Sequence, residues 1–337
     1  MTLPAPRVTV IVPVHNSSFH LGALFMRLDA SVAAHFQVIL VDDGSTDGSV
    51  EMLQSYASDH ASVELIVLPL RQGVAYARNT ALRAARGKYV WFVDDDDLWA
   101  ADALTRLLDA ADRSRASLIV CRAELREHVA SPGPVIDGID DDLVVDKSSA
   151  WQMLLDGVVN GYLWNKLFER STLGIDPFAS LSSQSDFTGV ARAVAASETV
   201  HFIPDVLYFH LVRQGSITRR RDPKLENLQA AYEVATSLHT TIMRRHFDSS
   251  IEHFRAWFLI VPFGNTPTRV RASWSLRCEG IRRARDAARG IDMRRLRLRS
   301  PRVHRVVWAI TRLGLLYLAI LQGVQGGRRV MRKVGLK

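Results

Sequence analysis

Three short polar runs stand out because each follows an apolar run typical of a β-strand. Pro13-Val14-His15-Asn16 follows the first, Asp42-Asp43-Gly44-Ser45 the second, and Asp94-Asp95-Asp96-Asp97 a later one. In a parallel sheet the carboxyl ends of the strands meet at one edge, and ligands bind there. We therefore expect the three runs to converge on one site.

The four adjacent aspartates are the most informative of these runs. Carboxylates at such close range repel one another unless a cation neutralises them. Their oxygens suit hard divalent ions such as Mg²⁺ or Mn²⁺, which usually also take phosphate oxygens of a substrate. In an extended segment Asp94 and Asp96 point the same way, so they can share one ion, or one ion and a ribose. The structural alternative is a solvated acidic loop before a helix that starts near Asp102.

Strands and helices alternate along the first half of the chain. Apolar, β-branched runs indicate the strands, and apolar residues at helical spacing indicate the helices. The expected strands are 7–14, 36–41, 63–68 and 89–93, and the expected helices are 19–34, 50–56 and 74–85. This order implies an α/β fold with a mixed, mostly parallel, Rossmann-like sheet and helices on both faces. No glycine pattern of the dinucleotide or P-loop type accompanies the strands.

Composition sets further bounds. The 337 residues suffice for about two domains. A hydrophobic content of 47% with 23% charged residues excludes the disordered, collagen-like and disulfide-scaffold classes. The two cysteines, Cys121 and Cys278, lack metal-ligand spacing, which argues against structural zinc and favours a reducing compartment. Residues 1–7 show no secretory pattern, so the expected location is cytoplasmic.

Four motifs, taken in order, resemble the family 2 glycosyltransferases of GT-A fold. They are VTVIVPVHN at 8–16, VILVDDGSTDGS at 38–49, RQGVAYARNTAL at 71–82 and GKYVWFVDDDD at 87–97. Each alone is weak, but together they are specific, and the resemblance covers about residues 7–218. It implies a transferase that uses a nucleoside-diphosphate sugar, with UDP favoured by family habit, and a divalent metal, Mn²⁺ or Mg²⁺.

The resemblance also assigns residues to the donor side. Asp43 would hydrogen-bond the nucleobase, and Arg78 would lie near the diphosphate, with a solvated helix residue as its alternative. Asp94-Asp95-Asp96 matches the family's DxD motif, with Asp96 as metal ligand, Asp94 shared between metal and sugar or ribose, and Asp95 beside the nucleotide sugar. The residues expected to line the nucleotide pocket are Pro13, Val14, His15 and Asn16.

On the acceptor side, the resemblance makes Asp186 the general base. The segment Ser185-Asp186-Phe187 matches a family position that usually reads Glu-Asp. Ser185 replaces the Glu, which leaves the orientation of the acceptor and the tuning of the base open. A base at this position would activate an acceptor hydroxyl for one in-line displacement, which inverts the anomeric centre. The structural alternative is an aspartate that caps a helix.

Two further segments match the family. In Trp164-Asn165-Lys166-Leu167-Phe168 we expect Trp164 and Phe168 to pack against the sheet edge, with Asn165 and Lys166 as pocket candidates. A loop at 212–218 matches one that closes over the diphosphate, so Arg213 and Ser216 are candidate donors to phosphate oxygens. His210, just before that loop, is either structural or a third metal ligand.

The back third of the chain is strongly basic. Residues 219–337 hold 26 of the 43 Lys and Arg residues but only 8 of the 35 Asp and Glu residues. We therefore expect a catalytic domain at 1–218 and a basic helical region at 219–337. The apolar stretch 303–322 is short for a membrane span and has arginines on both sides. It predicts an amphipathic helix on the anionic inner face of the cell membrane, or else a helix packed on the catalytic domain or on a partner chain.

The expected function is inverting transfer of a hexosyl or N-acetylhexosaminyl group to a glycan or lipid-linked acceptor. Cell-wall polymer or surface polysaccharide synthesis is the expected setting, with a homo-oligomer or a larger biosynthetic complex left open. The alternative is a non-catalytic module that binds sugar nucleotides or glycans, in which Ser185 marks lost activity. Nucleic-acid binding through the arginines is disfavoured, because no helix-turn-helix, RRM or zinc pattern accompanies them.

Overall fold

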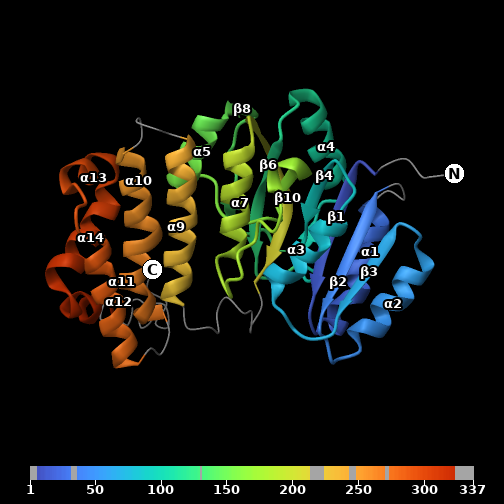
Figure 1. Ribbon diagram of the computed structural model, residues 1–337, viewed down its shortest axis with the longest axis horizontal. Coiled ribbons are helices and arrows are strands. Elements are labelled where there is room, and N and C mark those ends of the chain that lie inside the picture. Colours follow the sequence, from blue (N-terminus) through green and yellow to red (C-terminus); the bar gives the residue numbers. More distant parts are fainter. Residues whose placement is uncertain are drawn as a thin grey trace. The chain divides into compact units, whose positions relative to one another are not determined.

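The chain is arranged as two compact units, shown in Figure 1. The first unit spans Met1–Ser216 and the second Ile217–Lys337, whereas the division expected from the sequence falls after Thr218. The computed structural model describes residues 6–31, 36–129, 131–212, 224–242, 248–269 and 273–322.

One mixed sheet is the framework of the first unit. Its strands are β1 (Val8–Val14), β2 (Gln37–Asp43), β3 (Val63–Leu68), β4 (Tyr89–Phe92), β5 (Leu98–Trp99), β6 (Leu118–Arg126), β7 (Val135–Asp137), β8 (Leu143–Asp146), β9 (Lys166–Glu169) and β10 (Thr199–Leu211). The strand order is β3-β2-β1-β4-β9-β6-β10-β5, with β7 beside β6 and β8 beside β10. The long pairings among β1 to β4 and between β6 and β10 are parallel, and the pairings of the short strands β5, β7, β8 and β9 are antiparallel. The predicted mixed, mostly parallel sheet is confirmed.

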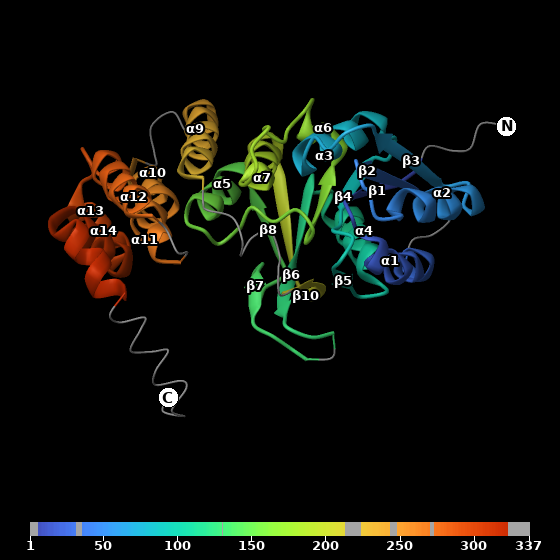
Figure 2. The same ribbon diagram turned by 90° about the horizontal axis from the view of Figure 1, so that it is seen from below.

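Helices cover both faces of this sheet. They are α1 (Ser18–Ser31), α2 (Ser49–Asp59), α3 (Val74–Ala84), α4 (Ala103–Ser114), α5 (Lys147–Leu155), α6 (Arg170–Leu173) and α7 (Ser185–Ala196). Because strand side chains alternate, Val10 and Val12 of β1 pack with α1, α2 and α4, whereas Phe92 of β4 contacts Phe178 on the other face. Figure 2 shows α3 and α7 on one side of the sheet, with α1 and α4 on the other.

Strand β9 corrects one prediction. It lies inside the sheet, between β4 and β6, so Trp164 and Phe168 do not pack against an edge, although both are buried. Asn165 and Lys166 are fully buried and do not line a pocket. The Lys166 ammonium donates to Asp137 over 2.7 Å and to Asn165 Oδ1 over 2.8 Å, because a buried cation needs an anionic partner.

Breaking the buried ion pair between Lys166 and Asp137 should strongly destabilise the fold. Both side chains are 0% exposed, so Lys166→Met leaves the Asp137 carboxylate buried without its cation. We expect the free energy of unfolding to fall by about 3 kcal/mol in urea titrations. Lys147→Met removes the partner of the exposed Glu198 and is the matched control, with an expected loss below about 1 kcal/mol. Equal losses in the two variants would contradict the prediction.

The second unit is helical in its described residues. It contains α9 (Leu225–Ile242), α10 (Asp248–Phe254), the π-helix η1 (Arg255–Ile260), α11 (Val261–Arg269), α12 (Trp274–Ala287), α13 (Met293–Arg299) and α14 (Pro301–Leu313). Phe263, Ile281, Leu296 and Ile310 from four of these helices meet in a core of its own. The predicted basic region therefore has a hydrophobic core.

The helix expected at 303–322 is interrupted. α14 ends at Leu313, Gly314 adopts a left-handed φ of 56°, and helix resumes at residues 315–322. Val307 and Ile310 on one side of the break, and Tyr317 and Leu318 on the other, are buried in the core of the second unit. This stretch therefore packs on its own unit rather than forming one free amphipathic helix. Among the described residues, no helix has the length and apolar character needed to span a bilayer.

Candidate active site

The loops after β1 and β2 are tied together by hydrogen bonds. His15 Nδ1 donates to the backbone carbonyl of Asp43 over 2.8 Å. The Asn16 backbone N–H donates to Ser45 Oγ over 2.9 Å, and Asn16 Oδ1 accepts from the Thr46 backbone N–H over 2.8 Å. His15 and Asn16, two of the residues expected at the nucleotide pocket, therefore lie against the β2 loop as the motif spacing predicts.

Val14 and Asp43, two other residues expected on the donor side, have almost fully buried side chains. Val14 is 1% exposed because strand alternation turns its side chain into the core, so that side chain does not line a pocket, whereas Pro13 is half-buried. The Asp43 carboxylate accepts backbone N–H bonds from Gln72 over 2.6 Å and from Gly73 over 2.9 Å. Asp43 therefore fixes the loop before α3, and its contact with a nucleobase stays a prediction.

Asp47 also joins the segments after β1 and β2 by hydrogen bonds. We expect its charge to make the stability of the fold depend on pH. Burial raises the pKa of Asp47, but the hydrogen bonds from Ser49 and Ser18 together lower it more, to about 2. Since the folded pKa lies below the ordinary value, the stabilisation is present above about pH 4 and is lost as the pH falls towards 2. Asp47 is exposed, so after allowance for solvent screening we expect Asp47→Asn to cost about 1 kcal/mol at pH 7.

Urea titrations of wild type and Asp47→Asn at pH 7 and pH 2.5 measure this effect. The difference between the two proteins should shrink at the lower pH, where the wild-type carboxylate begins to protonate. A difference that is constant across this range would show that Asp47 does not stabilise the fold through its charge.

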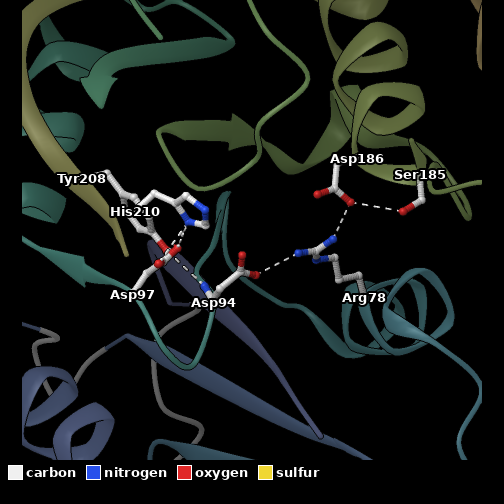
Figure 3. A network of polar contacts seen from close by, with 7 residues as sticks. All are labelled: Arg78, Asp94, Asp97, Ser185, Asp186, Tyr208 and His210. Carbon is white, nitrogen blue, oxygen red and sulfur yellow. Dashed lines mark hydrogen bonds and ion pairs between the residues drawn. The ribbon is translucent and has the colours of Figure 1, made fainter. Parts of the chain in front are cut away.

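The last of the four aspartates is structural. The Asp97 side chain is 0% exposed and accepts hydrogen bonds from Tyr208 Oη over 3.0 Å, His210 Nδ1 over 3.0 Å and the Leu211 backbone N–H over 2.9 Å. Tyr208 Oη in turn accepts from the Asp94 backbone N–H over 3.2 Å. Figure 3 shows this network beside the acidic turn. Asp97 therefore anchors the turn to β10 and leaves Asp94, Asp95 and Asp96 as the ligand candidates.

His210 belongs to this anchor. Burial lowers its pKa, but the hydrogen bond and charge of Asp97 raise it more, so the pKa lies above the ordinary histidine value. The rings of Tyr208 and His210 both stack on Trp164, with centroids 4.7 and 5.6 Å away. Asp97 engages only the Nδ1 atom of His210, and a metal-bound histidine commonly donates its other ring N–H to a carboxylate, so the structural role and the third-ligand role both stay predictions.

Arg78 joins the donor and acceptor sides of the site. Its Nη2 donates to Asp94 Oδ1 over 2.9 Å, and its Nη1 donates to Asp186 Oδ1 over 2.5 Å, as Figure 3 shows. The Arg78 side chain is 4% exposed, whereas Asp94 and Asp186 are 31% and 37% exposed. Burial lowers the pKa of Arg78, but the two carboxylates raise it more. The guanidinium therefore stays charged between them. The alternative of a solvated helix residue is wrong.

Asp186 is held through one of its two oxygens. Ser185 Oγ donates to Asp186 Oδ1 over 3.1 Å, so that oxygen accepts from both Ser185 and Arg78. Among the described residues, none donates to Asp186 Oδ2. The residue that caps α7 is Gln184, with no side-chain capping bond, so Asp186 is not the N-cap of this helix. Ser185, in place of the family's usual Glu, contacts the carboxylate directly.

The acidic turn has an unfavourable concentration of negative charge. Burial raises the pKa of Asp94; Arg78 opposes this rise, and the Asp96 and Asp186 carboxylates add to it. Asp95 and Asp96 are half-buried. No three His, Cys, Asp or Glu side chains of the described residues lie close enough to hold a metal ion by themselves. Arg213 and Ser216 lie outside the described residues.

The site lies at the edge of the sheet where β1, β2 and β4 end, and its residues follow the order of the four motifs. Residues 9–132 match the family described as Glycosyl transferase family 2. This part of the chain is a family 2 glycosyltransferase domain. The family match ends before Asp186 and His210, so those two residues are placed by the structure alone.

Known relatives of this glycosyltransferase domain agree with the match. The putative glycosyltransferase EpsH of Bacillus subtilis is 27% identical over 241 residues, which is 68% of each chain. The putative teichuronic acid biosynthesis glycosyltransferase TuaG of the same species is 39% identical over 110 residues, which is 32% of this chain and 43% of TuaG. The crystal structure of S. aureus TarS 1–349 in complex with UDP-GlcNAc superposes with a TM-score of 0.71 at 17% identity, covering 95% of this chain and 92% of the TarS 1–349 chain. That likeness confirms the expected GT-A fold.

Sequence reasoning missed two residues of the site. In the sequence analysis, Asp97 is treated together with its three neighbours and Tyr208 has no role. The available signal was alternation along β10, which places Tyr208 and His210 on the same face and therefore near one another.

Proposed function

We propose that this protein is an inverting glycosyltransferase that moves a hexosyl or N-acetylhexosaminyl group from a UDP-sugar to an acceptor hydroxyl. The observation that carries the proposal is the Arg78 guanidinium, which joins Asp94 of the acidic turn to Asp186 at the start of α7. Asp94 and Asp186, which are far apart in the sequence, are thereby brought into one site. The UDP-GlcNAc complex of TarS, which shares the fold, supports the choice of donor.

The donor set fits a divalent cation, Mn²⁺ or Mg²⁺. Asp94 and Asp96 supply oxygen ligands beside one another, and their mutual repulsion favours a cation at that place. Since the described side chains do not complete a metal site, the donor's diphosphate oxygens would supply further ligands. When bound, the ion acts as a Lewis acid on the charge that develops on the leaving diphosphate.

Asp186 then acts as the general base through Oδ2. Oδ1 is occupied by Ser185 and Arg78, so Oδ2 is the oxygen that takes the acceptor proton. The acceptor oxygen attacks the anomeric carbon from the side opposite the diphosphate, and the bond from that carbon to the diphosphate breaks. One such displacement inverts the anomeric centre, so an α-linked donor gives a β-linked product.

The proposed acceptor is a growing cell-wall or cell-surface polymer. The name of TuaG, a putative glycosyltransferase of teichuronic acid biosynthesis, supports this setting. A glycan carried on a lipid would place the enzyme at the inner face of the cell membrane, where nucleotide sugars are available. A homo-oligomer or a larger biosynthetic complex is compatible with this proposal.

A panel of nucleotide sugars tests the donor side. We expect UDP-sugars to raise the melting temperature when Mn²⁺ is present, and to be hydrolysed slowly without acceptor. Asp96→Asn should lose the Mn²⁺-dependent part of the shift, while Asp112→Asn, an exposed carboxylate paired with Arg7, should keep it. Tight UDP-sugar binding with no turnover under any acceptor would instead indicate a non-catalytic binding module. No binding of any sugar nucleotide would reject the proposal.

A further inference from the structure

The helix at residues 315–322 is apolar on both sides. Tyr317 and Leu318 are buried in the core of the second unit, whereas Leu315, Leu316 and Ile320 are 39, 58 and 50% exposed. A single exposed leucine is ordinary, but three on one short helix form a contiguous apolar patch. The interrupted helix thus keeps an outward apolar face although its other face is packed.

An arginine-lined cavity adjoins this apolar face. Its volume is about 360 Å³, and Leu315 forms part of its wall. Arg282, Arg285 and Arg289 also line it, opposed by one carboxylate, Asp286. Asp286 pairs with Arg289 over 3.1 Å and more weakly with Arg282 over 3.7 Å. The cavity therefore carries an excess of positive charge.

Leu315, which follows the break in the helix, lies in one wall of this cavity. Arg285 Nε donates to the Thr311 carbonyl over 3.1 Å, near the end of α14. The φ of 56° at Gly314 favours glycine, and the Arg285 guanidinium passes close over it, with Nη2 2.7 Å from the position that a Cβ would take. Arg285 is thus held in place between α12 and the exposed helix. Arg282 and Arg289 pair with Glu279 and Asp286 of α12, yet their side chains are 64% and 82% exposed, so a ligand can reach both.

The combination of charge and apolar surface favours one class of partner. Nucleic acid or a soluble polyphosphate would use the arginines but would gain little from exposed leucine and isoleucine. An anionic bilayer uses both, because its phosphates attract arginines and its acyl region accepts aliphatic side chains. Trp308, 49% exposed on α14 with the exposed Arg305 and Arg312 one turn to either side, has the side-chain type that prefers the membrane interface.

We propose that this surface docks on an anionic phospholipid bilayer, with a lipid phosphate in the arginine-lined cavity and Leu315, Leu316 and Ile320 among the upper acyl chains. The inference deepens the proposed membrane location but does not rest on the sugar-transfer chemistry. The chain would lie on the bilayer without crossing it.

Flotation of the full chain with vesicles tests the proposal. The probes are vesicles of phosphatidylcholine alone and of phosphatidylcholine with phosphatidylglycerol. Wild type should float only with the anionic vesicles, and added salt should weaken the binding. The double variants Leu316→Ser with Ile320→Ser, and Arg282→Gln with Arg289→Gln, should each bind about tenfold more weakly. Matched controls are Ile175→Ser, an exposed aliphatic residue, and Arg86→Gln, an equally exposed arginine, both in the first unit.

Several results would overturn the proposal. They are absence of flotation with anionic vesicles, equal flotation with both vesicle types, or undiminished binding by the two double variants. Binding of random duplex DNA that is as tight as vesicle binding, and survives Leu316→Ser with Ile320→Ser, would reassign the surface to nucleic acid. Thermal unfolding and UDP-sugar hydrolysis of each variant show that the fold and the first unit are intact. A chain that floats but transfers no sugar would reject the proposed function and not this docking surface.

Discussion

Asp186→Asn should lower kcat by about three orders of magnitude, while leaving the affinity for the sugar nucleotide nearly unchanged. The substitution keeps the shape of the side chain and its contacts with Arg78 and Ser185, but an amide does not take the acceptor proton. Steady-state transfer kinetics give kcat, and titration with UDP gives the affinity. Since the base acts on the acceptor, hydrolysis of the donor by water should fall as well.

Two comparisons sharpen this test. Asp176→Asn changes an exposed carboxylate paired with Arg83 in the same unit, and kcat should change less than about twofold. Ser185→Ala removes one of the two bonds to Asp186 Oδ1 and should cost about tenfold in kcat, with recovery in Ser185→Thr, which restores a hydroxyl. An Asp186→Asn enzyme with wild-type kcat would show that another group takes the proton.

Arg78→Met should lower kcat by about two to three orders of magnitude, because it leaves Asp94 and Asp186 without their shared cation. Arg78→Lys should also be severely impaired, since one ammonium does not reproduce the two-pronged contact of a guanidinium. Both variants should weaken UDP-sugar binding less than they reduce kcat. Transfer kinetics separate the two effects, and thermal unfolding checks that each protein is folded.

Arg83 provides the control for Arg78. It lies five residues further along α3, is half-exposed and pairs with Asp176. Arg83→Met should therefore leave kcat within about twofold of wild type. If Arg78→Lys and Arg83→Met were equally active, the guanidinium would not be needed to hold the base.

The regular core of the fold could be predicted because its signals are local. Runs such as Val8–Val14 are buried on both faces, and continuous β-branched sequence is typical of such strands. The position of β9 could not be predicted from local sequence, since its pairing with β4 and β6 joins residues 46 to 80 positions apart in the chain. The helix breaks at Gly314, whose φ of 56° is a backbone conformation that hydropathy along the chain does not indicate.

In the candidate site, too, features set by local sequence could be predicted, whereas features set by distant contacts could not. The motifs located the acidic turn and both loops of the donor side, because strand ends of a parallel sheet converge. They did not predict that Asp97 differs from Asp94, since that difference arises from Tyr208 and His210 more than 100 residues away. The hydrogen bond from Ser185 to Asp186 could not be predicted either, because it depends on the orientation of the two side chains.

The shared guanidinium has a consequence for the sequence of events in a catalytic cycle. Arg78 binds the carboxylates of both Asp94 and Asp186. A ligand that takes Asp94 away from Arg78 therefore leaves the guanidinium to interact with Asp186 alone. In the proposed reaction, a donor that engages Asp94 would thus strengthen the hold of Arg78 on Asp186. We therefore expect such an enzyme to bind its two substrates in a compulsory order, with the nucleotide sugar first.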